Sequence, residues 1–198
     1  MVVIGGDGSF TGARIFNEEY DIPFVGIPGA IDNDIFGTDY TIGYDTALNT
    51  VAEAVDKIRD TASARNRMFF VEVMGAEAGF IALFSGIATG TEAIIIPEIR
   101  GDGKNLKTLI ETGNSRKKTS NIIIVAEVDE EEGSPSAIDR VNASRLGHAA
   151  VEALLDNQKS VMVGISNGEI MLIPLRRAVK LHKDVNHSLV ELAKILSV

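Results

Sequence analysis

The sequence contains no cysteine among its 198 residues. Disulfide bonds, thiolate nucleophiles and cysteine-ligated zinc are therefore excluded. It also lacks an apolar run long enough to cross a membrane, and its first residues, MVVIGGDGS, are typical of a strand and turn rather than of a signal peptide. An excess of cations is missing too: the formal net charge is -9, which argues against nucleic-acid binding. We expect a globular cytoplasmic protein with neither nucleic acid nor membrane as a partner.

Hydrophobic residues make up 45% of the sequence, and 19 residues are glycine, a combination typical of α/β proteins. Short β-branched runs alternate with helical patterns, which predicts right-handed crossovers and a mainly parallel sheet between helices, a three-layer α/β fold. The predicted strands are 2–5, 24–27, 68–74, 93–96, 121–126 and 160–165, and the predicted helices are 41–62, 79–88, 104–114 and 134–157.

Two local signals refine this pattern. Ser134 followed by Pro135 predicts a helix that starts with Ser134 as its N-cap and proline at the first helical position. Asn167 and Gly168 lie between two apolar runs, VMVGIS and EIMLIPL, and predict a hairpin turn. The sheet should therefore contain one antiparallel pair near the end of the chain.

Gly5, Gly6, Asp7, Gly8 and Ser9 form the GGDGS turn, which follows a predicted strand and precedes a helical stretch. Glycine lets a backbone approach phosphate closely, and a helix start offers free N–H donors. A carboxylate in the same turn could hold Mg²⁺ directly or through water. The alternative is a tight strand-to-helix turn in which the aspartate only caps the helix.

Residues 28–34, PGAIDND, form a second loop after a predicted strand, the IDND loop. Its two acidic groups, Asp32 and Asp34, suit one base for a hydroxyl nucleophile and one partner for a metal or for orientation. Ligands of open α/β sheets bind outside the carboxyl ends of strands, where both loops should lie. The alternative is a turn-rich loop whose Asp and Asn side chains satisfy their own backbone.

A third region carries Arg65 and Arg67 before a predicted strand and the segment 74–79, MGAEAG, after it. The arginines could bind phosphate, while the glycines would open a strand-to-helix turn. From the residues alone, solvated arginines are the favoured interpretation. Solvent-exposed or structural roles are likewise expected for the acidic stretch 127–132 and for His148, His182 and His187.

Several motifs occur together in a fixed order: VVIGGDGSFTGA, PGAIDNDIFGTDYTIGYDTALNT, KIRDTA, VEVMG, IIIPE, IIIVAE and GSPSAIDRVNASRLG. This sequence resembles the bacterial ATP-dependent 6-phosphofructokinases over nearly its whole length. The resemblance implies transfer of the ATP γ-phosphate, with Mg²⁺, to the 1-hydroxyl of fructose 6-phosphate. It also implies a nucleotide lobe from 1–43 and 133–179 and a sugar lobe from 44–132 and 180–198, which we expect to be reduced toward a single domain, 1–198.

The resemblance assigns roles to individual residues. Asp32 matches the catalytic base and Asp34 its acidic partner. Asp7 matches the Mg²⁺-linked aspartate, and the nucleotide-phosphate turn is Gly6, Asp7, Gly8 and Ser9. Sugar-binding positions are Ile31, Asp32, Arg67, Met74, Gly75 and Glu127, of which Arg67 would reach the sugar phosphate of a neighbouring subunit. Remnants of an allosteric nucleotide site are Arg59, Glu92, Arg116 and Lys118.

Departures from the family fall on ligand contacts. Ala30 stands where the family has a threonine that contacts the transferred phosphoryl group, and Ala76 stands where it has an arginine that stabilises the transition state. Close to a third of a family member is missing before residue 1, and some two dozen residues are missing between Glu127 and Gly133. These losses predict a trimmed scaffold, engineered or alternatively a decayed paralogue, with weak or no turnover.

Other interpretations stay open. The chain could be part of an active 6-phosphofructokinase that another chain completes, or a module that only binds phosphate or nucleotide. The partners implied by the resemblance are ATP, ADP and fructose 6-phosphate, and exposed apolar surface left by the missing segments favours a homo-oligomer.

Overall fold

The computed structural model describes residues 1–65, 68–75, 78–99, 121–127 and 135–196. The chain forms two compact units, Met1–Thr46 with Ser134–Asp184 and Ala47–Gly133 with Val185–Val198. The expected bounds of the two lobes stay a prediction. The grouping of both lobes into one domain stays a prediction.

The first unit is built on a four-stranded sheet with strand order β1-β2-β6-β7. The strands are β1 (Val2–Gly5), β2 (Val25–Pro28), β6 (Val161–Ser166) and β7 (Glu169–Pro174). The first three run parallel, and β7 is antiparallel to β6. The predicted hairpin is confirmed: Asn167 and Gly168 link β6 to β7 with φ values of 52° and 82°, the left-handed conformations that a tight hairpin turn requires.

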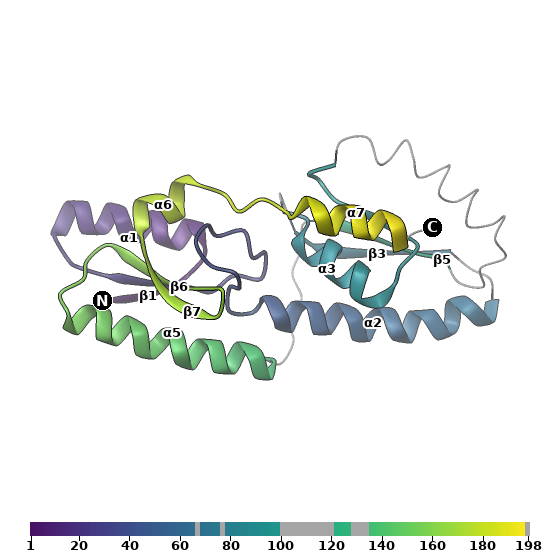
Figure 1. Ribbon diagram of the computed structural model, residues 1–198, viewed down its shortest axis with the longest axis horizontal. Helices are drawn as coiled ribbons and strands as arrows, with labels where there is room; N and C mark the ends of the chain where they lie inside the picture. Colours follow the sequence, from purple (N-terminus) through teal and green to yellow (C-terminus); the bar gives the residue numbers. More distant parts are fainter. Residues whose placement is uncertain (66–67, 76–77, 100–120, 128–134, 197–198) are drawn as a thin grey trace. The chain divides into compact units, whose positions relative to one another are not determined.

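Helices cover both faces of this sheet, as Figure 1 shows. On one face lie α1 (Asp7–Tyr20) and α6 (Leu175–Lys180), and on the other lies α5 (Ala137–Leu155). Adjacent β6 residues separate the two cores, because Met162 packs against α1 and α6 while Val163 packs against α5. The predicted three-layer arrangement with a mainly parallel sheet is therefore confirmed in this unit.

The predicted start of α5 is wrong. The helix begins at Ala137, and its N-cap is Ser136, whose Oγ accepts a hydrogen bond from the backbone N–H of Asp139 at 3.2 Å. Ser134 lies outside the described residues. An N-cap hydroxyl binds the free backbone N–H group three residues after it. Ser136 stands three residues before Asp139 and therefore caps the helix.

Helix α2 (Tyr44–Arg65) begins three residues after the predicted start, because a contact from a distant element sets its first turn. The carboxylate of Asp139 accepts hydrogen bonds from the backbone N–H groups of Gly43 at 3.0 Å and Thr46 at 2.8 Å, and from the Thr46 hydroxyl. Asp139 is 2% exposed, so these bonds are shielded from water. The start of α2 is thus capped by a side chain of α5.

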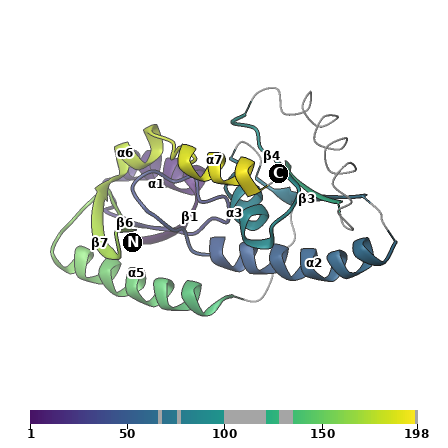
Figure 2. The same cartoon turned by 45° about the vertical axis from the view of Figure 1, so that its right-hand side comes forward.

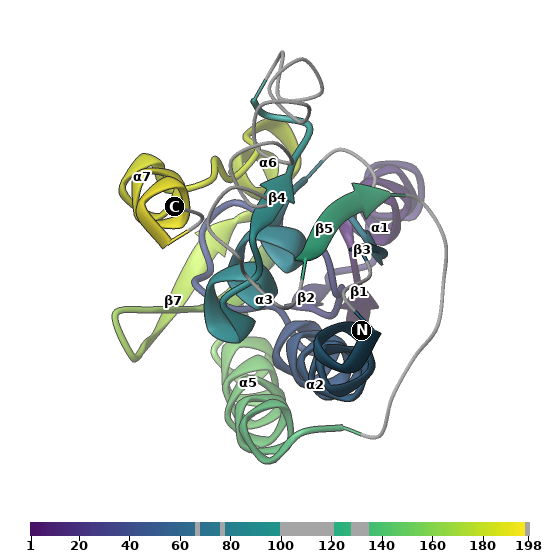
Figure 3. The same cartoon turned by 90° about the vertical axis from the view of Figure 1, so that its right-hand side faces the viewer.

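The second unit contains a three-stranded parallel sheet with order β3-β5-β4. Its strands are β3 (Met68–Met74), β4 (Ala93–Ile95) and β5 (Asn121–Glu127). Helix α3 (Phe80–Thr89) packs against all three strands, and α7 (His187–Leu196) packs against α3 and β4 (Figures 2 and 3). The predicted helix 104–114 lies outside the described residues.

Loss of the hydrogen bonds by which Asp139 caps the start of α2 should destabilise the first unit. We expect Asp139→Asn to lower its free energy of unfolding by about 1–3 kcal/mol, because an amide group would face the N–H donors of α2. Urea denaturation followed by circular dichroism measures this change. Asp156→Asn, at the exposed C-terminal end of the same helix, serves as the control. Equal effects of the two substitutions would contradict the capping role.

Candidate functional site

The GGDGS turn and the IDND loop leave the first sheet side by side. Strands β1 and β2 are parallel neighbours, with Gly5 opposite Pro28 at their carboxyl ends. The backbone N–H of Gly29 donates to the Gly5 carbonyl oxygen at 3.1 Å. A Cβ atom built on Gly6 would lie 3.5 Å from the Cβ of Ala30. The two loops therefore meet as expected for the carboxyl edge of a parallel sheet.

The GGDGS turn passes directly into α1, so that Asp7, Gly8 and Ser9 form the first helical turn and are exposed. The N-cap residue is Gly6, which has no side chain with which to cap the helix. The interpretation of Asp7 as that cap is thus not the observed one. Exposed N–H groups at the start of a 14-residue helix form a suitable place for an anion.

The IDND loop is held by the side chain of Asn33, which is 2% exposed and has a φ of 55°. Its Nδ2 donates to the carbonyl oxygen of Asp39 at 3.1 Å, and its Oδ1 accepts from the Thr41 N–H at 2.9 Å. The Thr41 hydroxyl in turn donates to the carbonyl oxygen of Ala30. The alternative interpretation of this loop, in which Asn side chains bind its backbone, thus describes Asn33, a residue type that tolerates a left-handed loop position.

The two carboxyl groups of the loop are both half-buried. Burial raises the pKa of Asp32 above its usual 3.8, and the negative charge of Asp34 raises it further. A raised pKa makes a carboxylate a better proton acceptor at neutral pH. Asp32 thus has the electrostatic environment of a general base, and Asp34 contributes to it.

Ala30 lies between these features. Its side chain is half-buried and packs against the core formed by α1, α6 and the neighbouring strands. Its methyl group can neither donate nor accept a hydrogen bond. Where Gly6 of the GGDGS turn meets Ala30 of the IDND loop, only backbone groups of these two residues can form hydrogen bonds, because the Ala30 side chain is a methyl group.

In the second unit, Met74 and Glu127 end two paired strands, and their Cα atoms lie opposite each other. Gly75 follows Met74 with a φ of 155°, and a Cβ there would lie 2.6 Å from the carbonyl oxygen of Ala78. Only glycine fits this turn, as the MGAEAG motif predicted. Arg67 and Ala76 lie outside the described residues.

Two of the residues assigned to an effector site make contacts within the second unit. The guanidinium of Arg59 donates to the carbonyl oxygen of Thr89 at 2.6 Å, at the C-terminal end of α3. The Glu92 carboxylate accepts from the Ile122 N–H at 2.7 Å, between β4 and β5. Arg116 and Lys118 lie outside the described residues. An effector site here stays a prediction.

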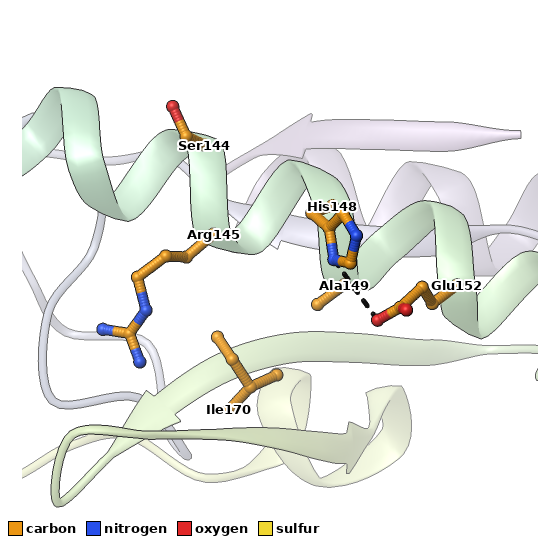
Figure 4. Close-up of a pocket in the computed structure, with 6 residues that line it drawn as sticks. All are labelled: Ser144, Arg145, His148, Ala149, Glu152 and Ile170. Atoms are coloured by element: carbon orange, nitrogen blue, oxygen red, sulfur yellow. Dashed lines mark ion pairs between the residues drawn. The ribbon is translucent and has the colours of Figure 1, made fainter.

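A groove of about 430 Å³ lies between α5 and β7. It is lined by the residues drawn in Figure 4: Ser144, Arg145, His148, Ala149, Glu152 and Ile170. The Arg145 guanidinium donates to the Gly168 carbonyl oxygen at 2.6 Å, and His148 Nδ1 lies 3.3 Å from a carboxylate oxygen of Glu152. None of these residues belongs to the predicted site. His148 is exposed on the surface of α5.

Across the described ranges, no three His, Cys, Asp or Glu residues group closely enough to form a metal site. Magnesium commonly uses only one or two carboxylates together with substrate phosphates, so the exposed Asp7 is still a compatible donor. No described helix has the length and hydropathy of a membrane span.

Together, the fold and the two loops define an α/β protein with a glycine-rich strand-to-helix turn beside a loop that carries two aspartates. A family model described as Phosphofructokinase matches residues 1–134, and the chain belongs to this family. It is 47% identical over 227 residues to ATP-dependent 6-phosphofructokinase 2 of Bacteroides thetaiotaomicron and 47% identical over 225 residues to ATP-dependent 6-phosphofructokinase 1 of Thermus thermophilus. Each comparison covers 100% of this chain and 70% of the relative.

Solved structures of other phosphofructokinases have a similar fold. The phosphofructokinase of Pichia pastoris in the T-state matches with a TM-score of 0.81 and 30% identity, over 98% of this chain and 26% of that chain. That of Saccharomyces cerevisiae matches with a TM-score of 0.81 and 29% identity, over 98% and 33%. This chain therefore spans only part of each relative. An alignment of 227 positions to 198 residues also requires gaps in this chain, which is compatible with the shortened junction after Glu127.

The raised pKa of Asp32 gives a stability prediction. Its contribution to stability is complete below the usual pKa of 3.8 and is lost as the pH rises through the higher folded-state pKa. Asp32→Asn keeps this position neutral at every pH. We therefore expect the variant to be more stable than the wild type at pH 7, with an advantage that shrinks toward pH 4.

Thermal unfolding at several pH values measures this effect, with Asp156→Asn as the control. A variant that is less stable than the wild type at pH 7, with an unchanged control, would show that ionised Asp32 is well accommodated.

Proposed function

We propose that this chain carries the proton-accepting and nucleotide-phosphate parts of a 6-phosphofructokinase site, and that its own turnover is weak or absent. The observation that supports this most directly is the pairing of a half-buried, more basic Asp32 with the inert methyl of Ala30 beside Gly6. The substrates proposed are ATP and fructose 6-phosphate, with ADP as a product. The relatives' names carry the same activity.

In this proposal, Asp32 accepts the proton of the sugar 1-hydroxyl as that oxygen attacks the γ-phosphate. The N–H groups at the start of α1 bind nucleotide phosphates, and Gly6 and Gly8 allow their close approach. Asp34 orients the loop and adds negative charge next to the base. By the resemblance alone, we propose sugar-binding roles for Ile31, Met74, Gly75 and Glu127. Arg67 is proposed to reach the sugar phosphate of a neighbouring subunit.

Magnesium is proposed as the cofactor. Asp7 would hold it together with the nucleotide phosphates, and the ion would neutralise charge on those phosphates. The exposed position of Asp7 in the first turn of α1 leaves the carboxylate accessible for this role.

Weak turnover follows from what the residues do not supply. Phosphoryl transfer depends on positioned donors and cations around the moving charge. Family members have a hydroxyl at the position of Ala30 and a guanidinium at that of Ala76. Neither alanine can replace them. Whether the trimming is engineered or natural does not alter this expectation.

A second candidate, an active enzyme completed by another polypeptide, is favoured by exposed apolar side chains in the first unit. Among the described residues, strand β1 is an edge of its sheet, and its Ile4 side chain is 66% exposed. Leu155 of α5 is 76% exposed in the same unit. Such side chains favour association, either with another polypeptide or as a homo-oligomer. Native mass spectrometry would distinguish a monomer from both assemblies. A cytoplasmic location is proposed with either candidate.

The kinase proposal predicts a specific gain of function. We expect no ADP release above background from the wild type with ATP, Mg²⁺ and fructose 6-phosphate. Ala30→Thr combined with Ala76→Arg should raise ADP release to on the order of 10²-fold above that background, because both transition-state contacts return. A coupled spectrophotometric assay measures this, and Ala30→Val with Ala76→Arg is the matched control, since valine has the shape of threonine without its hydroxyl.

Clear saturable turnover by the wild type would refute the weak-activity part of the proposal. Titration calorimetry with ATP, ADP and fructose 6-phosphate tests a module that only binds these ligands. Absence of heat with all three ligands counts against that alternative.

A further inference from the structure

The segment that follows α6 makes three contacts with the end of the IDND loop and with residues 35–39, which come directly after it. Ile35 and His182 form an antiparallel bridge. The backbone N–H of Lys183 donates to the Asp34 carbonyl oxygen at 3.0 Å. The Lys183 ammonium donates to the Asp39 carbonyl oxygen at 2.6 Å. A single lysine thus contacts both the acidic end of the loop and the residue five positions later.

The carbonyl oxygen of Asp39 is shared by two donors. It accepts from Lys183 Nζ at 2.6 Å and from Asn33 Nδ2 at 3.1 Å. Asn33 lies between the two carboxylates of the loop, and its Oδ1 holds the Thr41 N–H. A continuous set of hydrogen bonds therefore leads from the ammonium group to the residue next to Asp32.

The surroundings of Lys183 are acidic. Its side chain is half-buried, and burial lowers its pKa to about 8, while the charges of Asp39 and Asp34 act in the opposite direction. Lys183 is therefore still mostly protonated at pH 7. From the loop, Asp34 and Asp39 face this lysine, and on its own segment its neighbours His182 and Asp184 are exposed. Asp34 therefore interacts electrostatically with both the Asp32 carboxyl and the Lys183 ammonium.

We propose that Lys183 is a positioning residue for Asp32. Lys183 fixes the IDND loop through the Asp39 carbonyl oxygen and Asn33, and its positive charge balances the negative charge of Asp34. Its effect on turnover rests on the proposed kinase function, whereas its effect on the loop does not. Lysine suits this role because its ammonium is a compact cation that can donate to a carbonyl oxygen while facing carboxylates.

The test that does not need activity compares Lys183→Met with Lys180→Met, a change of an exposed lysine in α6. By nuclear magnetic resonance, Lys183→Met should speed amide exchange of Thr41 roughly tenfold, the effect of losing one hydrogen bond. It should also raise the pKa of Asp32, because the charge of Asp34 is no longer offset. Amides of β6 should exchange as in the wild type. Lys183→Arg, which keeps the positive charge, should bring Thr41 exchange and the Asp32 pKa most of the way back to their wild-type values.

Two further measurements complete the test. In wild-type protein, the Asp32 carboxyl resonance should show a second inflection near pH 8, where Lys183 titrates. This experiment needs no variant and covers the case in which Lys183→Met fails to fold. In the Ala30→Thr, Ala76→Arg background, Lys183→Met should lower kcat about tenfold, in line with the expected loop opening, and leave KM for ATP unchanged.

Each outcome decides one proposal. Equal Thr41 exchange and equal Asp32 pKa in the Lys183→Met and Lys180→Met variants would overturn the positioning role, as would a single inflection of Asp32 in the wild type. Faster exchange throughout β6 would instead show a general structural role and would also overturn it. Failure of every variant to release ADP would refute the kinase function while the resonance data still decide the role of Lys183.

Discussion

The arrangement of the loops in the first unit depends on the hydrogen bonds of the buried Asn33 side-chain amide. This group binds the backbone at Asp39 and Thr41, and Thr41 binds Ala30, so one amide closes a loop of about a dozen residues. Removing it would leave backbone groups without partners away from water, at about 1–3 kcal/mol for each group. Thr41 is thus fixed three residues before Tyr44, where α2 begins under the cap provided by Asp139.

Negative charge dominates this region. Asp32, Asp34 and Asp39 occur within eight residues of one another in a protein whose formal net charge is -9. A carboxylate with a raised pKa is an unfavourable feature of the folded state at neutral pH, and such features concentrate where chemistry is performed. The ammonium of Lys183 and the N–H groups around Asn33 partly offset the unfavourable energy of this negative charge.

Much of the fold could be predicted from the sequence. The strand Met68–Met74 has the predicted bounds, because its β-branched and aromatic residues stand between clear boundary signals. The meeting of the GGDGS turn and the IDND loop also followed from general rules for parallel sheets. Helix starts were less accurate. Ser134 was expected to cap α5, where Ser136 does so, and the start of α2 depends on Asp139, which is more than ninety residues away in the chain.

The same limit explains the parts of the site that were missed. Lys183 reaches Asp39 across 144 residues of sequence, and no local pattern around LHKD distinguishes this lysine from a surface residue. Asn33 was part of a motif that was recognised, but the motif shows only which residue types occur together. Which amide atom meets which carbonyl oxygen is decided by the packing of β2, β6 and the segment after α6.

The contact between positions 6 and 30 has a consequence for how such a site can change over generations. A Cβ at Gly6 would lie 3.5 Å from that of Ala30, so the two positions share one small volume. A larger side chain at either position leaves less room for growth at the other. Substitutions at these two positions should therefore be coupled across a lineage, and the order in which they arise should determine which later sequences are accessible.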